Sequence, residues 1–286
     1  MTVASGRPVC VLGVGRSGTS LTARALNVLG VDLGPQETML QPSEINPKGY
    51  WEQREVVDLN DEILAALGGE WWCPPPRPPG WELAEGMAGL RGRIADLVER
   101  SFARSSRWGF KDPRTTLTLP IWRAVLGELD YVICLRNPLE VRASAVGALP
   151  EGGDEIALWL HYGCEALRLT AGHRRVFVFY EEWLHDADEV AIRLERFLGG
   201  ADGVRGRASE RAASEWEPSL RRRRASEDDL ARSDDVAIEA RAFHFLVREL
   251  AAAERRDDPA ARDRARALQA VTAALDGTPQ TDPRRR

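Results

Sequence analysis

The chain has 286 residues, a formal net charge of −5 and four cysteines. This length is sufficient for one large α/β domain with a substantial core. The acidic balance argues against a general nucleic-acid-binding protein, because such proteins need a broad basic face to neutralise backbone phosphates. No apolar run reaches the roughly eighteen residues of a membrane span, and no leader pattern precedes the first apolar segment, so we expect a cytoplasmic protein. The cysteines lack metal-ligand spacing and are predicted to be reduced.

Apolar segments rich in β-branched residues alternate with helical patterns through most of the chain. The expected strands are 8–12, 31–33, 108–110, 131–135 and 176–179. The expected helices are 21–29, 52–67, 83–103, 117–126, a short one that begins at Pro138, 154–171 and more than one helix around 181–198. This order is typical of a parallel sheet covered by helices on both faces. The sequence therefore predicts an α/β fold with a P-loop-like parallel sheet.

Two segments depart from this alternation. The stretch WWCPPPRPPGW at 71–81 is a proline-rich loop, because its prolines have no amide to contribute to a regular element. Beyond Gly199 the composition changes to Arg, Ala, Glu and Asp, with helical windows at 234–254 and 259–275. We expect an α/β domain over 1–200 and, over 201–286, an irregular link and a helical extension that packs on that domain or trails from it.

The stretch VLGVGRSGTS, residues 11–20, has the outline of a phosphate-binding loop. Its glycines have the spacing of the pattern GxxxxGK[ST], but Thr19 stands at the lysine position and Arg16 lies inside the loop. Amides and hydroxyls at the start of the following helix favour an anion. The residues predicted to hold a phosphate are Gly15, Arg16, Ser17, Gly18, Thr19 and Ser20.

A charged or aromatic residue follows each of the five expected strands: Arg16, Glu37, Lys111, Arg136 and Tyr180. Ligands of open parallel sheets bind outside the carboxyl ends of the strands, so we expect these side chains to share one crevice. The fourth strand, YVICLR, ends in arginine where a nucleotide triphosphatase would place a magnesium-binding aspartate. No metal is therefore predicted.

Three stretches, GRSGTS, CLRNPLEVRAS and VFVFYEEWL, resemble the sulfotransferases that use 3′-phosphoadenosine 5′-phosphosulfate (PAPS). The resemblance covers roughly residues 8 to 200, and GPQETML and FKDP are similar to the tyrosylprotein sulfotransferases and their bacterial relatives. It implies that Arg16 is the basic residue of the 5′-phosphosulfate loop and that Arg136 and Ser144, eight residues apart, bind the 3′-phosphate. It also implies that Tyr180 lies near the adenosine.

The same resemblance implies the catalytic roles. Glu37, which stands 21 residues after Arg16, takes the place of the catalytic glutamate, and Lys111 that of a lysine near the transferred group. The cytosolic small-molecule sulfotransferases have a histidine base where this chain has Asp112, so the base is assigned to Glu37. Glu52 and Asp112 remain alternative bases.

The expected activity is sulfuryl transfer from PAPS, without a metal, to a hydroxyl of a glycan, glycolipid or secondary metabolite. The alternatives are a P-loop kinase or nucleotide hydrolase, which would need magnesium, and a non-catalytic nucleotide-binding module. The arginines of 221–224 either close over the 3′-phosphate or form a solvated run. The aromatic residues either contact the acceptor or pack the proline-rich loop; they are Tyr50, Trp51, Trp71, Trp72 and Trp81. The oligomeric state stays open.

Overall fold

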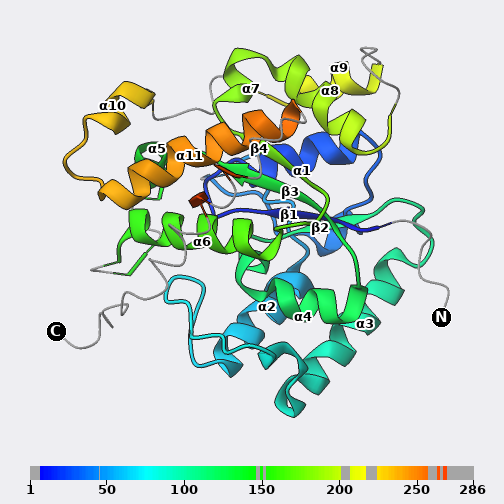
Figure 1. Ribbon diagram of the computed structural model, residues 1–286. Helices are drawn as coiled ribbons and strands as arrows, with labels where there is room; N and C mark the ends of the chain where they lie inside the picture. The colour runs from blue at the N-terminus through cyan, green and yellow to red at the C-terminus, as the bar shows by residue number, and fades with distance from the viewer. Residues whose placement is uncertain are drawn as a thin grey trace.

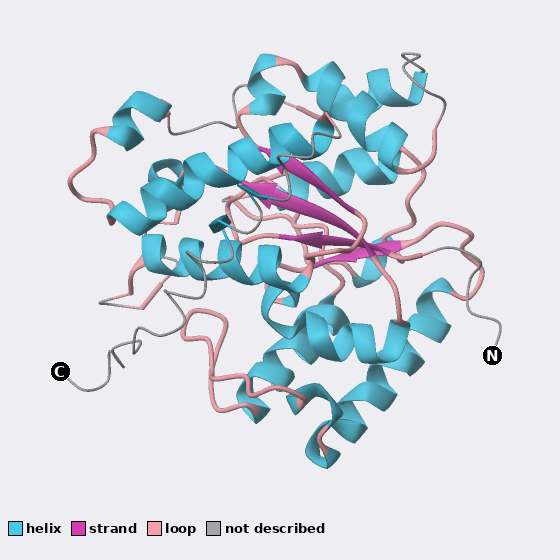
Figure 2. Ribbon diagram, viewed as in Figure 1, coloured by secondary structure: helices cyan, strands magenta, loops and turns pink. Residues whose placement is uncertain are grey.

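Four parallel strands form one sheet in the order β2-β1-β3-β4 (Figures 1 and 2). The computed structural model describes residues 7–44, 46–145, 149–150, 153–200, 207–216, 224–256, 263–264 and 267–268. The strands are β1 (Val9–Leu12), β2 (Gly109–Lys111), β3 (Asp130–Leu135) and β4 (Arg175–Phe179). The predicted α/β class with a parallel sheet is confirmed.

The strand expected at 31–33 is wrong. This segment makes a single parallel bridge, from Asp32 to Trp108 at the edge of the sheet. The amide of Gly34 donates to the side-chain oxygen Oδ1 of Asp32 at 2.8 Å, and Gly34 has a φ of 91°. This local turn diverts the chain before a second bridge forms, because an aspartate side chain competes with the sheet for backbone donors.

Helices cover both faces of the sheet, as Figure 1 shows. One face packs on α1 (Thr19–Val28), α8 (Ala187–Phe197) and α9 (Arg207–Ala213). The other packs on α2 (Arg54–Ala66), α3 (Ala88–Phe102), α4 (Thr115–Leu126), α6 (Glu155–Leu169) and α11 (Ile238–Arg255). Along β1, Val9 and Val11 join the first core and Cys10 and Leu12 the second. Both faces are buried, and for this reason the strands read as continuous apolar runs.

Shorter helices complete the described part of the chain. They are η1 (Gln36–Thr38), η2 (Trp81–Leu83), η3 (Glu85–Met87), α5 (Pro138–Ser144), α7 (Glu182–His185) and α10 (Glu227–Ala231). Pro138 begins α5, where its missing amide costs nothing, and Asn137 caps that helix by accepting from the amide of Leu139. No described helix is both long and apolar enough to cross a bilayer.

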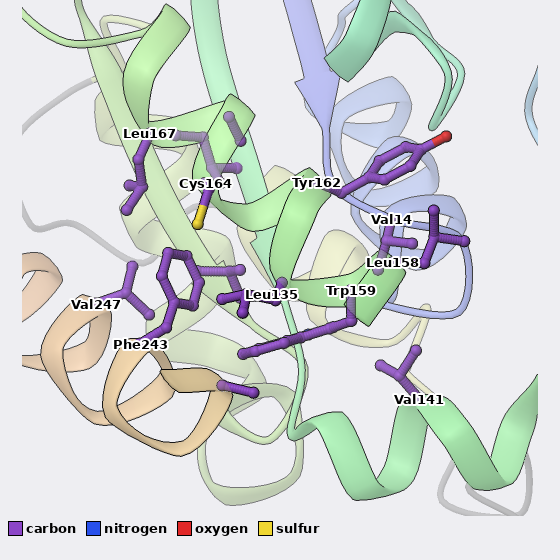
Figure 3. Close-up of a cluster of buried hydrophobic side chains, with 14 of the residues drawn as sticks. Val14, Leu135, Val141, Leu158, Trp159, Tyr162, Cys164, Leu167, Phe243 and Val247 are labelled. Atoms are coloured by element: carbon purple, nitrogen blue, oxygen red, sulfur yellow. The ribbon is translucent and has the colours of Figure 1, made fainter. Parts of the chain in front are cut away.

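The helix α11 covers most of the window predicted at 234–254, ends one residue beyond it and packs on α6 (Figure 3). The Phe243 ring meets Trp159 edge-on, with 5.4 Å between the ring centroids. Gly163 makes room for it, because a Cβ there would lie 2.6 Å from the Phe243 ring. The second window, 259–275, falls almost entirely outside the described residues.

Candidate functional site

The loop between β1 and α1 is shaped by glycines that no other residue could replace without strain. Gly13 has a φ of 131°, and a Cβ there would lie 2.3 Å from the carbonyl oxygen of Cys134. Gly18 has a φ of 86°, and its Cβ would lie 2.7 Å from the Tyr180 ring. The loop therefore passes closely against the ends of β3 and β4 before α1 begins at Thr19. This places the N-terminal amides of α1 at the carboxyl edge of the sheet.

Arg16, Arg136 and Ser144 meet across this edge although they are far apart in the chain. The Nε of Arg16 donates to the Oγ of Ser144 at 3.0 Å, and Nη1 of Arg136 donates to the carbonyl oxygen of Arg16 at 3.1 Å. The guanidinium of Arg136 also lies over the Tyr180 ring, 4.0 Å from its centroid. Four separate segments are thus joined at one point: the loop, the end of β3, α5 and the end of β4.

Arg136 is held by a buried carboxylate. Its Nε and Nη2 donate to the Oε2 of Glu140 at 2.9 and 2.7 Å, and the other oxygen of Glu140 accepts from the amide of Ala225 at 3.0 Å. A guanidinium carries five N–H groups, and the bonds to Glu140 and Arg16 use three of them. Arg136 is therefore fixed in position and keeps donors for a ligand.

Lys111, the last residue of β2, forms a buried ion pair with Glu52. The side chains are 1% and 8% exposed, and the Nζ of Lys111 also donates to the Oγ of Ser20 at 3.3 Å. Burial raises the pKa of Glu52, while Lys111 acts in the opposite direction. The carbonyl of Glu52 accepts from the amide of Leu40 at 2.8 Å, so its backbone is held as well.

These groups line one cavity of about 330 Å³. The predicted residues that line it are Gly15, Arg16, Gly18, Thr19, Ser20, Lys111, Arg136, Ser144 and Tyr180. Ser17 belongs to the loop, but its side chain is buried and does not line the cavity. Four cationic side chains and a single carboxylate, that of Glu52, face the space. Such a lining suits an anionic ligand.

The structure does not bring Glu37 to this cavity. Glu37 is exposed on η1 and is absent from the lining. Because residues 31–33 form only one bridge, no strand carries Glu37 to the carboxyl edge. Glu52 reaches that edge from the segment before α2, while Asp112 lies beneath the lining, where it accepts from Asn60 and Arg114.

Sequence reasoning missed further residues of the site. Arg114 and Tyr162 line the cavity, and Trp216 packs edge-on against Tyr180 with 5.4 Å between the ring centroids. Tyr162 lies in the middle of α6, where an aromatic residue at helical spacing indicates only a core position. Trp216 comes from the segment after α9 that the sequence predicts only as an irregular link.

The arginine run is only partly described. Residues 221–223 lie outside the described part of the chain. Arg224 is described and lines a different cavity, together with His244 and Arg248 of α11. Among the described residues, no group of three or more His, Cys, Asp or Glu side chains could hold a metal ion.

No protein-family model and no curated protein matches the chain. Among solved structures, it is similar to the sulfotransferase domain from the curacin biosynthetic pathway (TM-score 0.42, 14% identity, 82% of each chain). It is also similar to a sulfotransferase from Mycobacterium tuberculosis (TM-score 0.41, 16% identity, 74% of this chain and 72% of that one). A third structure is retinol dehydratase in complex with androsterone and inactive cofactor PAP (TM-score 0.37, 15% identity, 98% and 84%). These likenesses concern overall architecture alone.

Proposed function

We propose that the protein is a PAPS-dependent sulfotransferase that acts on a hydroxyl acceptor. The observation that carries this proposal is the meeting of Arg16, Arg136 and Ser144 at one cavity that Lys111 also lines. These residues come from three separate stretches of the sequence, GRSGTS, FKDP and CLRNPLEVRAS, and each stretch resembles part of a PAPS-dependent sulfotransferase. A chance arrangement would not bring all of them to one edge of the sheet.

The residues present fit a nucleotide with phosphates at both ends of its ribose. The amides of residues 15–20 and Arg16 would hold the 5′-phosphosulfate at the start of α1. Arg136 would bind the 3′-phosphate through its remaining N–H groups, with Ser144 adding a hydroxyl. Tyr180 is the residue that we assign to the adenosine, and Trp216, packed against it, would support that contact.

In this proposal Glu52, rather than Glu37, is the general base. It would accept the proton of the acceptor hydroxyl as the acceptor oxygen bonds to sulfur and the bond from sulfur to the bridging phosphate oxygen breaks. A raised pKa makes its carboxylate a better proton acceptor, and a well-placed base contributes roughly 10²- to 10⁴-fold.

Lys111 links the base to the leaving group. While Glu52 is ionised, the ammonium of Lys111 is paired with it. Once Glu52 takes up the proton, this pairing weakens and the charge of Lys111 becomes available to the departing phosphate oxygen, which Arg16 also stabilises. Cations that act more strongly on the transition state than on the ground state are what lowers the barrier.

Nucleotide binding tests the proposal directly. Calorimetry with 3′-phosphoadenosine 5′-phosphate (PAP) should show binding, and Arg136→Ala should weaken it at least tenfold, because a charge-assisted bidentate contact is lost. Arg93→Ala, which removes an exposed pair with Glu62, should bind PAP normally. The melting temperature of Arg136→Ala is measured as well, because this variant leaves Glu140 buried without its partner. If the protein binds ATP with magnesium and does not bind PAP, the kinase or hydrolase alternative replaces the sulfotransferase proposal.

A further inference from the structure

Part of the cavity wall is made of aromatic rings and prolines. These residues are Pro47, Tyr50, Trp71, Pro113 and Tyr162. Tyr50 stands two residues before Glu52, and Pro113 two residues after Lys111, so this wall adjoins the proposed catalytic pair. None of the five carries a charge. The phosphate-binding groups, in contrast, gather where the loop meets Arg136 and Ser144.

The hydroxyls of this wall are already engaged within the protein. The Tyr50 hydroxyl is 2.6 Å from the Oγ of Ser43, and the Tyr162 hydroxyl donates to the carbonyl of Trp71 at 2.8 Å. Asn46, which lines the cavity beside Pro47, donates its Nδ2 to the Oγ of Ser20 at 3.2 Å. A sugar acceptor needs partners for several hydroxyls, since each one taken from water without a new partner costs free energy. The wall therefore favours an acceptor ring that has few hydrogen-bonding groups.

The charge of Arg114, which lines the cavity beside Pro113, is balanced by carboxylates. Arg114 forms ion pairs with Asp112 at 3.0 Å and with Asp61 at 2.6 Å, and Asp112 also accepts from the side-chain Nδ2 of Asn60 at 2.8 Å. One guanidinium and two carboxylates leave this group with a formal charge of −1. An acceptor that carried a carboxylate or phosphate would find no free positive charge here.

Trp71 is held firmly although it lies in a loop. Arg77 ties the proline-rich segment to α6 through Glu165 at 3.0 Å, with both side chains less than a tenth exposed, and through His161 at 3.2 Å. The bond from Tyr162 to the Trp71 carbonyl adds a third attachment. The Trp71 side chain is itself partly buried against the apolar cluster that contains Tyr162. A ring positioned in advance loses little entropy when a ligand stacks on it. The guanidinium of Arg114 also lies over the Trp71 ring, 5.9 Å from its centroid.

We propose that the acceptor is a small alcohol with an uncharged aromatic ring, which packs on Trp71 while its hydroxyl reaches Glu52. This inference rests on the proposed sulfotransferase activity. It selects a small aromatic metabolite from the acceptor classes that the sequence leaves open, and it excludes glycans. Trp71 becomes the residue that determines acceptor specificity.

Three primary alcohols test this choice: benzyl alcohol, cyclohexylmethanol and methyl β-glucoside. Each presents a primary hydroxyl. The ring is planar and aromatic in benzyl alcohol, puckered and apolar in cyclohexylmethanol, and hydroxylated in methyl β-glucoside. The Kd of each is measured by calorimetry with PAP saturating, and kcat/KM with PAPS. Aromatic contacts are worth about 0.5–1.5 kcal/mol beyond area, so benzyl alcohol should exceed cyclohexylmethanol by about two- to twelvefold in both readouts. Methyl β-glucoside should be the poorest of the three.

Two neighbouring tryptophans provide a matched pair of variants. Trp71→Ala should remove the preference for benzyl alcohol and leave PAP affinity unchanged. Trp72→Ala should keep the preference for benzyl alcohol and the PAP affinity, because Trp72 does not line the cavity and its indole donates to Glu70. Melting temperatures of both variants report whether either change disturbs folding.

The outcomes distinguish failure of the aromatic-acceptor proposal from failure of the sulfotransferase proposal. If PAP binds but methyl β-glucoside is preferred, if none of the alcohols binds to the PAP complex, or if both alanine variants behave alike, the aromatic acceptor is refuted and the sulfotransferase proposal stands. If the protein fails to bind PAP at all, both fall.

Discussion

The substitution Glu52→Gln tests the buried pair with Lys111 through stability and activity together. Removing one partner of a buried ion pair leaves the other charge uncompensated, which costs about 3–5 kcal/mol. This cost applies to Lys111, because its side chain is only 1% exposed and its charge would stay buried without a partner. At about 2–4 °C per kcal/mol for a chain of this size, the melting temperature should fall by roughly 6–20 °C. The double variant Glu52→Gln/Lys111→Met removes both charges and should recover most of this loss.

Activity is then measured well below the lowered melting temperature, with PAP binding as the check that Glu52→Gln is folded. Loss of the base should lower kcat by about 10²- to 10⁴-fold, equivalent to about 3–5 kcal/mol of transition-state stabilisation. PAP affinity should hold or rise, because Glu52 is assigned to neither phosphate and its loss frees the charge of Lys111 for the 5′-phosphate. Glu37→Gln is the control: an exposed residue outside the cavity should change stability by no more than about 0.5 kcal/mol and leave kcat intact.

The pattern of the two glutamine variants decides the assignment. Full activity in Glu52→Gln together with inactivity in Glu37→Gln would show that the exposed segment closes onto the site and that the sequence resemblance had named the correct base. A melting temperature unchanged by Glu52→Gln would contradict the buried ion pair itself.

Three further outcomes follow from particular contacts. Asn60→Ala should destabilise the fold by about 3 kcal/mol or more in urea titrations, because Asn60 is fully buried and accepts from the indole of Trp122 at 2.8 Å, and each orphaned group costs about 1–3 kcal/mol. Gly163→Ala should cost about 1–3 kcal/mol in the same assay, since its Cβ would press on the Phe243 ring. Activity needs ionised Glu52, and burial raises the pKa of this carboxyl, so kcat/KM should begin to fall with decreasing pH above the pKa of an exposed glutamate. The residual activity of Glu52→Gln should lack this decrease at acid pH.

The sequence predicted the sheet well because both of its faces are buried. Continuous apolar runs mark β1, β3 and β4, and the expected boundaries agree to within one residue. The prediction failed at 31–33, whose short apolar pattern is overridden by the turn between Asp32 and Gly34. Short runs carry too little pattern to outweigh a local hydrogen bond.

The site was predicted unevenly for a related reason. Arg16, Lys111 and Arg136 sit at or next to strand ends or in the loop, so the geometry of a parallel sheet is enough to group them. Glu37 lies on the three-residue helix η1, and Glu52 lies two residues before α2 although the sequence places it at the start of that helix. Neither position has a period that specifies the direction of the side chain, and the family resemblance favoured the glutamate that the fold leaves exposed. The partners of the site from helices, such as Tyr162, depend on which turn of α6 faces the loop, which is a tertiary property.

Backbone strain distinguishes the two glutamates in a way that no propensity would reveal. Among the described residues other than glycine, a positive φ occurs at Arg16, 72°, and at Trp51, 62°. Such a conformation is a genuine outlier for a bulky residue and persists only where the surroundings impose it. At Trp51 they do so through the indole, which donates to the carbonyl of Lys48 at 3.1 Å. One strained residue lies in the phosphate loop and the other immediately precedes Glu52, so the fold maintains strain at the two points that direct a charge into the cavity. No such constraint acts at Glu37, which supports Glu52 as the residue that the fold has placed for chemistry.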